Sequence, residues 1–130
     1  MLRLWSDYGR IVKVRKGVYV ERATSPDVVE ALRVGGRLAC ISAAVHLGLI
    51  GGRRRSLHIS VPREMSRLRT RHNARLRLAD FPDDSVVLHW SRAAPDGDRQ
   101  SVSPDTALSQ MSRCAHPDAR SAIGETAANR

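Results

Sequence analysis

Cysteine is scarce in this sequence of 130 residues, which contains only Cys40 and Cys114. The two lie far apart, and neither belongs to a Cys-x-x-Cys pair of the kind used in redox or zinc chemistry. A small extracellular fold held together by several disulfides is therefore excluded. The pattern favours a reduced, cytoplasmic setting.

Aromatic residues and long apolar runs are also rare. Only five residues are Trp, Tyr or Phe, so we expect a core of Val, Leu, Ile and Ala in a small mixed fold. The first fifteen residues already carry Arg3, Asp7, Arg10 and Lys13, which excludes the apolar segment of a signal peptide or a membrane span. We expect no membrane partner.

Patterns of catalytic or metal-binding residues are missing as well. The sequence has no Gly-x-Ser-x-Gly nucleophile elbow, and its histidines show neither an i, i+4 nor a His-x-Glu spacing. His58 and His89 each lie in an alternating segment, and we interpret both as ordinary strand-face residues. We therefore expect no enzyme activity, no metal, no cofactor and no small-molecule substrate.

Positive charge is abundant and unevenly distributed. The net charge is +9, and arginine outnumbers lysine twenty to two. Residues 1–25 hold six basic residues against two acids, and residues 51–80 hold nine against two, whereas residues 81–130 hold five against seven. Two basic blocks of this kind are typical of proteins that contact phosphates. Solubility and a coding bias toward arginine remain the alternative explanation.

The first part of the chain predicts a helix followed by a hairpin. Residues 2–8 place Leu4, Trp5 and Tyr8 on one helical face. Residues 11–15 and 18–20 read as strands around a turn at Lys16-Gly17. A helix before a basic hairpin is typical of the second half of a winged helix-turn-helix.

The remainder predicts alternating helices and strands. Ser25-Pro26-Asp27 and Ser103-Pro104-Asp105 are helix starts, with Ser as N-cap and Pro in the first turn. A short apolar helix begins at Ser42. Strands are expected at 57–61, 76–78 and 85–90, a mobile arginine-rich loop at 63–75, and a weak helix at 119–129. The predicted fold class is α+β, an incomplete winged helix-turn-helix followed by a small mixed α/β module with a largely antiparallel sheet.

The expected arrangement of helices and strands predicts one hydrophobic core and one exposed group of arginines. The apolar faces of the predicted elements assign the core to Val28, Leu32, Ala44, Leu47, Ile59, Val61, Val87, Leu108 and Met111. The arginines of the second basic block should be exposed, because only two acids lie nearby in the sequence and an unpaired buried charge is costly. These are Arg53, Arg54, Arg55, Arg67, Arg69 and Arg71.

Six segments, taken in order, resemble the AbiEi-like antitoxin family of type IV toxin–antitoxin systems. The same module precedes a very-short-patch-repair-like endonuclease domain in related proteins. The matching segments are residues 9–20 (GRIVKVRKGVYV), 31–38 (ALRVGGRL), 42–49 (SAAVHLGL), 57–62 (LHISVP), 88–90 (LHW) and 103–108 (SPDTAL).

The resemblance implies a winged head that binds the protein's own promoter, joined to an α/β module. It divides the chain into a partial head (1–22), an antitoxin-like α/β module (23–116) and a weak helix or truncated end (117–130). The chain begins at the expected recognition helix and ends before the second large domain of the longer relatives, so we expect a fragment or a shortened member.

The leading hypothesis is a DNA-binding transcriptional regulator or antitoxin, with a cognate toxin protein as a possible second partner. The alternatives are the non-catalytic N-terminal part of a very-short-patch-repair-like endonuclease and a protein-binding module. The predicted nucleic-acid contacts are Arg3, Arg10, Lys13, Arg15, Lys16, Arg53, Arg54, Arg55, Arg67, Arg69 and Arg71.

Overall fold

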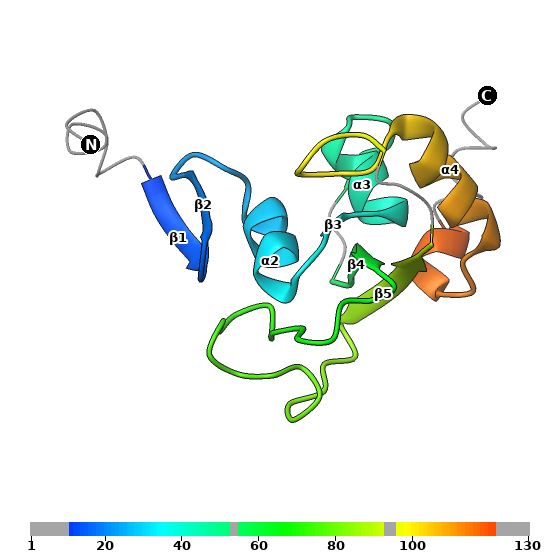
Figure 1. The fold of residues 1–130 in the computed structure, drawn as a ribbon. Helices are drawn as coiled ribbons and strands as arrows, with labels where there is room; N and C mark the ends of the chain where they lie inside the picture. The colour runs from blue at the N-terminus through cyan, green and yellow to red at the C-terminus, as the bar shows by residue number, and fades with distance from the viewer. Residues whose placement is uncertain (1–10, 53–54, 93–95, 122–130) are drawn as a thin grey trace.

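A computed structural model describes residues 11–52, 55–92 and 96–121 of the chain, and the description below concerns these residues. They form a mixed α and β structure with a two-stranded sheet, a three-stranded sheet and helices packed around the larger sheet (Figure 1). None of the described helices has the length and apolar character needed to cross a membrane.

An antiparallel hairpin opens the described chain, as the sequence predicts. Strand β1 (Ile11–Arg15) pairs with β2 (Val18–Glu21) around Lys16-Gly17, where Gly17 adopts a φ of 79°. A residue without a Cβ takes that conformation at little cost. Val14 and Val20 point inward and are buried, so the hairpin contributes to the main hydrophobic core.

Helix α2 (Pro26–Val34) begins at the predicted cap. The Ser25 hydroxyl accepts a hydrogen bond from the Val28 N–H, and Pro26 occupies the first turn. The helix ends at Gly35, and Gly36 then lies against strand β4 (Leu57–Pro62). A Cβ on Gly36 would stand 2.1 Å from the Ser60 carbonyl oxygen, so this close approach requires glycine.

Strand β4 is the centre of the three-stranded sheet. It pairs antiparallel with β3 (Arg37–Leu38) on one side and parallel with β5 (Val86–Ser91) on the other. The prediction of a largely antiparallel sheet is therefore wrong for its longest pairing. A parallel pair needs a long crossover connection, which residues 63–85 provide.

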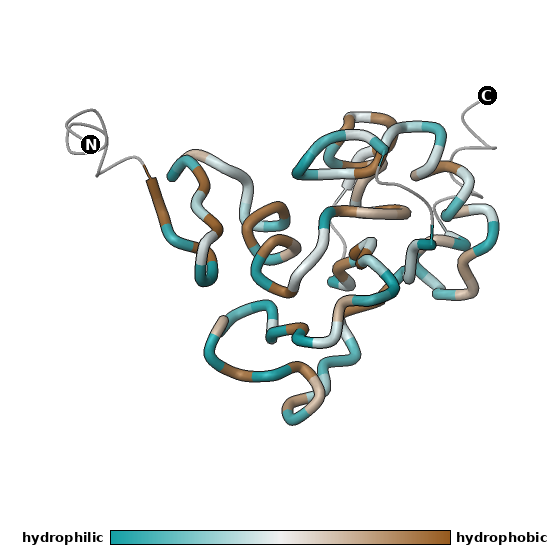
Figure 2. Tube along the Cα trace, in the orientation of Figure 1, coloured by the Kyte–Doolittle hydropathy of each residue, from teal (hydrophilic) through white to brown (hydrophobic). Residues whose placement is uncertain are grey.

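This crossover is irregular and mostly hydrophilic (Figure 2). The strand predicted at residues 76–78 does not form, and the segment contributes one isolated bridge between Arg69 and Arg77. Leu68 and Leu78 turn inward and pack against the core instead. The alternation of Leu76-Arg77-Leu78 thus reflects a loop that buries occasional side chains.

Helices α3 (Cys40–His46) and α4 (Pro104–Arg113) pack against each other, and α3 also packs against β4. Helix α4 has the predicted start, because the Ser103 hydroxyl accepts from the Thr106 N–H. Helix α3 begins two residues before the predicted Ser42. The Ser42 hydroxyl instead accepts a hydrogen bond from the His58 N–H of β4.

The core contains most of the predicted residues. Val28, Leu32, Ala44, Ile59, Val61 and Met111 are buried. Leu47 and Leu108 are exposed by 37% and 42%, and Val87 is half-buried, so these three predictions are wrong or only partly right. Leu47 follows the last residue of α3, and Leu108 lies on the outer face of α4.

Some predicted elements lie outside the described residues. The helix at 2–8 falls there entirely, and with it the test of a winged helix-turn-helix. Of the weak C-terminal helix, residues 117–121 are helical and the rest is not described.

The burial pattern predicts unequal effects of leucine truncation on stability. Leu32→Ala removes a buried side chain of α2 and should lower the free energy of unfolding by about 2–5 kcal/mol. The matched control, Leu108→Ala on α4, should change it by less than about 0.5 kcal/mol, because that side chain already meets solvent. Urea denaturation followed by circular dichroism measures both, and equal effects would contradict the arrangement of the core.

Candidate nucleic-acid interface and buried cysteine–histidine cluster

The predicted phosphate-binding residues are only partly exposed. Lys13, Lys16, Arg55 and Arg67 are exposed, whereas Arg15, Arg69 and Arg71 are partly buried. The predicted contacts Arg3, Arg10, Arg53 and Arg54 lie outside the described residues.

Arg15 joins the two basic blocks in space. Its guanidinium donates to the carbonyl oxygens of Arg33 and Val34 at the end of α2, at 3.5 and 3.4 Å, and to that of Arg67 in the crossover at 3.4 Å. Burial, and then the nearby Arg69 guanidinium, lower the pKa of Arg15. Side chains from residues 11–16 and 67–69 therefore form one surface, which we call the basic face.

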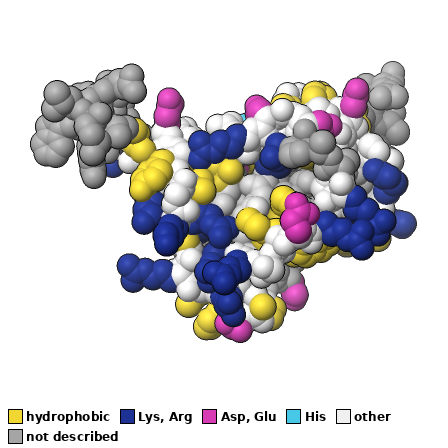
Figure 3. Space-filling model, viewed as in Figure 1, with side chains coloured by type: hydrophobic (Ala, Val, Ile, Leu, Met, Phe, Trp, Pro, Cys, Tyr) yellow, Lys and Arg dark blue, Asp and Glu magenta, His cyan; other side chains and the backbone are white. Residues whose placement is uncertain are grey.

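The basic face comprises the exposed Lys13, Lys16 and Arg67 and the partly buried Arg15 and Arg69. In the described part of the chain, none of the five has a carboxylate within ion-pairing distance. Figure 3 shows lysine and arginine side chains gathered over the hairpin and the crossover. Their charge is thus available to a polyanion.

Arg71 corrects the prediction that the whole arginine block is exposed. Its side chain is 11% exposed, and its Nε atom lies 2.9 Å from a carboxylate oxygen of Glu30 on α2. The same guanidinium donates to the Ser85 hydroxyl at 2.7 Å and the Arg55 carbonyl at 3.2 Å. The prediction counted only acids near in sequence, and the partner lies forty-one positions away.

Arg69 is likewise only half exposed, and its backbone N–H donates to the Val34 carbonyl at 3.0 Å. Arg33 in turn donates to the Arg71 carbonyl at 2.6 Å. The crossover, predicted as a mobile loop, is therefore tied to the C-terminal half of α2 by several hydrogen bonds.

A second group of potential ligand side chains includes two histidines on the larger sheet. In the parallel pairing of β4 with β5, His58 stands beside Val87. Because side chains alternate between the faces of a strand, His89 points to the same face as Val87 and hence as His58. The His58 Nδ1 and His89 Nε2 atoms lie 3.1 Å apart.

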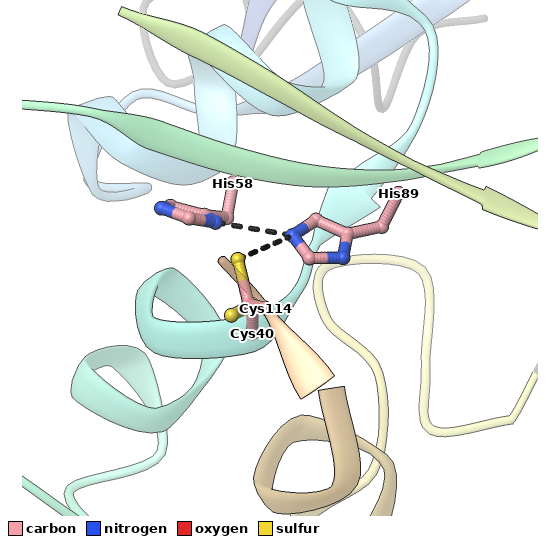
Figure 4. Close-up of side chains that lie close together, drawn as sticks. All are labelled: Cys40, His58, His89 and Cys114. Atoms are coloured by element: carbon pink, nitrogen blue, oxygen red, sulfur yellow. Dashed lines mark hydrogen bonds between the residues drawn. The ribbon is translucent and has the colours of Figure 1, made fainter. Parts of the chain in front are cut away.

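Both cysteines of the chain reach the same place from helix ends. Cys40 is the first residue of α3, and Cys114 directly follows α4. The Cys114 Sγ atom lies 4.0 Å from His89 Nε2. Figure 4 shows the four side chains converging, and one potential ligand atom from each lies within 4.8 Å of all the others. We call Cys40, His58, His89 and Cys114 the Cys–His cluster.

The backbone at Cys40 is strained. Its φ is 52°, and it is the non-glycine residue with a left-handed conformation among those described. Such a conformation costs about 1–3 kcal/mol and persists where neighbouring contacts impose it. Here the Cys40 N–H donates to the Gln110 side-chain oxygen at 2.9 Å, which fixes the start of α3 against α4.

Burial favours the uncharged forms of Cys40, His58 and His89. It lowers the pKa of His58 to about 4, with a further contribution from His89 and His116, and it also lowers the pKa of His89. Burial, followed by the adjacent Cys114, raises the pKa of Cys40 to about 12. At neutral pH the imidazoles are neutral, and each ring has one nitrogen with a lone pair.

His116 and Asp118 stand next to the cluster. The His58 and His116 rings meet edge to face with centroids 5.2 Å apart. The Asp118 carboxylate accepts from the Ser56 hydroxyl, and the Asp118 N–H donates to His116 Nδ1 at 3.2 Å. His58, His116 and Asp118 also place one potential ligand atom each within 4.8 Å of one another.

No local sequence pattern indicates this cluster. Its members come from α3, β4, β5 and the segment after α4, so no two have a spacing that indicates a metal motif. The interpretation of His58 and His89 as strand-face residues places them on the sheet but misses that they share a face.

Comparison with known proteins found no relative of this chain. No family model, curated protein or solved structure matches this chain. The resemblance to AbiEi-like antitoxins therefore stays a prediction from the sequence.

The Arg71–Glu30 pair predicts a strong effect of neutralising Glu30. Glu30→Gln should lower the free energy of unfolding by about 3 kcal/mol, because it leaves a largely buried guanidinium without its counter-charge. The control is Glu64→Gln, which neutralises an exposed acid of the crossover and should have less than about 0.5 kcal/mol of effect. Urea denaturation compares them. A Glu30 variant as stable as the control would show that the pair does not hold the crossover.

Proposed function

We propose that this protein is a DNA-binding regulator of the antitoxin type and that the basic face contacts the phosphate backbone. The observation that supports the proposal most strongly is the contact of Arg15 with Arg67. It brings two basic blocks that are far apart in the sequence onto one surface, as a binding site for a continuous polyanion requires.

The hairpin has the shape and chemistry of a wing. Lys13 lies on the exposed side of β1, and Lys16 lies in the turn at the hairpin tip. Val14 and Val20 fix the opposite side of the hairpin in the core. Ammonium groups presented in this way contact phosphate oxygens without reading base edges.

The same geometry argues for electrostatic attraction as the main source of affinity. Each phosphate neutralised by a lysine or arginine releases condensed counterions, so affinity falls steeply with salt. Sequence-specific recognition, in contrast, needs side chains held against base edges in the major groove. In the proposed winged head that role belongs to residues 2–8, which lie outside the described residues.

Fluorescence anisotropy of labelled duplex DNA at several salt concentrations tests the proposal. The expected result is binding that weakens steeply with salt and differs little between the upstream promoter sequence and a scrambled duplex. Replacing Lys13 and Lys16 together by alanine should reduce the slope of log K against log salt by about 2.

The matched control replaces Arg113 and Arg120, two exposed arginines at and beyond the end of α4, by alanine. It removes the same charge at the other end of the molecule from the hairpin (Figure 1) and should leave the salt slope within about 0.5 of the unmodified protein. Equal losses in the two double variants would show nonspecific attraction to net charge, and no binding at low salt would remove DNA as the partner.

A further inference from the structure

We propose that the Cys–His cluster is a structural zinc site, in which Cys40, His58, His89 and Cys114 bind one Zn²⁺ ion. The donor set is the first argument. Two thiolates and two imidazoles are the ligands that Zn²⁺ takes in closed, four-coordinate structural sites. This inference is independent of DNA binding, because the cluster shares no residue with the basic face.

The distances suit a single ion. Zn–N bonds of about 2.0–2.1 Å and Zn–S bonds of about 2.3 Å, in a tetrahedron, hold the ligand atoms about 3.3–3.8 Å apart. The two imidazole nitrogens lie 3.1 Å apart, and the Cys114 sulfur lies 4.0 Å from His89 Nε2. Because every pair of potential ligand atoms lies within 4.8 Å, movements of no more than about 1 Å would complete the tetrahedron.

Hydrogen bonding alone does not satisfy these side chains. His89 Nε2 faces both His58 Nδ1 and the Cys114 sulfur, but an imidazole nitrogen has either one proton or one lone pair to offer. His58 is fully buried, and its Nε2 atom has no hydrogen-bond partner. A cation among the ligand atoms would use the lone pairs that now compete for a proton.

Binding of Zn²⁺ releases two protons and leaves the site without net charge. Zn²⁺ displaces the two thiol protons to solvent, and the two thiolates neutralise its charge. His58 then coordinates through Nδ1 and keeps its proton on Nε2, the atom that has no hydrogen-bond partner. A carboxylate oxygen of Asp118 lies within 4.8 Å of one of the His58 nitrogens.

The second group of possible ligands, His58, His116 and Asp118, carries a weaker argument. It offers three ligands and no thiolate. Two of its members are already engaged, since Asp118 accepts from Ser56 and His116 Nδ1 accepts from the Asp118 N–H. A His116→Ala variant therefore separates the two sites.

A zinc ion in the Cys–His cluster would connect four separate parts of the chain. The two histidines lie on neighbouring strands, Cys40 begins α3 and Cys114 follows α4. With all four positions filled by protein, no position remains for a substrate or a reactive water, so the role is structural.

Metal content and cobalt spectroscopy test the site on tag-free protein. Mass spectrometry should find about one zinc per chain. The metal-free protein titrated with Co²⁺ should develop the d–d bands of tetrahedral cobalt and a thiolate charge-transfer band. Because the chain has only two cysteines, that band can come only from Cys40, Cys114 or both.

Variants then assign the ligands. Cys114→Ser, at a half-buried position, should weaken Co²⁺ binding by more than about 100-fold, because loss of an outer partner alone costs 10–100-fold. His116→Ala and His46→Ala, the second at an exposed position of α3, should keep the thiolate band and an affinity within about threefold of the unmodified protein.

Three results of the metal-binding experiments would overturn the proposal. One is a Co²⁺ spectrum without the thiolate band. Another is loss of binding in His116→Ala with retention in Cys114→Ser, which would assign the ion to the second group. The third is a Cys40–Cys114 disulfide that, once reduced, leaves a protein unable to take up Zn²⁺ or Co²⁺.

A stability measurement adds a readout that does not depend on the variants. Zinc should raise the Tm of the metal-free protein by at least about 10 °C, and chelation should reverse the change. An unchanged Tm would show that no ion holds the four segments together.

Discussion

The parallel pairing of β4 with β5 is the constraint on which most of the structure depends. Parallel neighbours cannot be joined by a tight turn, so the chain must leave the sheet after Pro62 and return before Val86. The resulting crossover carries much of the arginine of the second basic block and meets α2 through Arg71, Arg33 and Arg69. The same pairing fixes the register that puts His58 and His89 on one face. The parallel direction of β5 therefore positions both the arginine-rich crossover and the two histidines of the Cys–His cluster.

Local chemistry made much of the fold predictable. Ser25 and Ser103 mark their helices because a serine followed by proline satisfies the first free N–H groups of a helix. The turn at Lys16-Gly17 marks the hairpin for an equally local reason. What failed depended on contacts between distant residues. The direction of β5 is set by its pairing with β4. The loop at 76–78 has the alternating sequence of a strand because Leu78 packs inward.

In the candidate sites, too, local features were predictable from the sequence and features that depend on distant contacts were not. Exposure of Lys13, Lys16 and Arg67 followed from charge and pattern, whereas burial of Arg71 required an acid on α2 that sequence proximity could not indicate. The Cys–His cluster is the extreme case, since its four members come from four segments. A motif search depends on fixed spacing, and a site assembled by the tertiary fold has none. A buried histidine without a full set of hydrogen bonds was the sign, and only the structure reveals it.

The attachment of Arg15 to the backbone of α2 and the crossover affects what binding to the hairpin would cost. A flexible basic arm loses conformational entropy when a polyanion orders it, and that loss is subtracted from the affinity. The hairpin is already held in position by these hydrogen bonds and by Val14 and Val20 in the core. Docking on it would bury little new apolar surface and order few residues. Calorimetry of such a complex would accordingly show a small heat-capacity change, the signature of a preformed surface and not of folding coupled to binding.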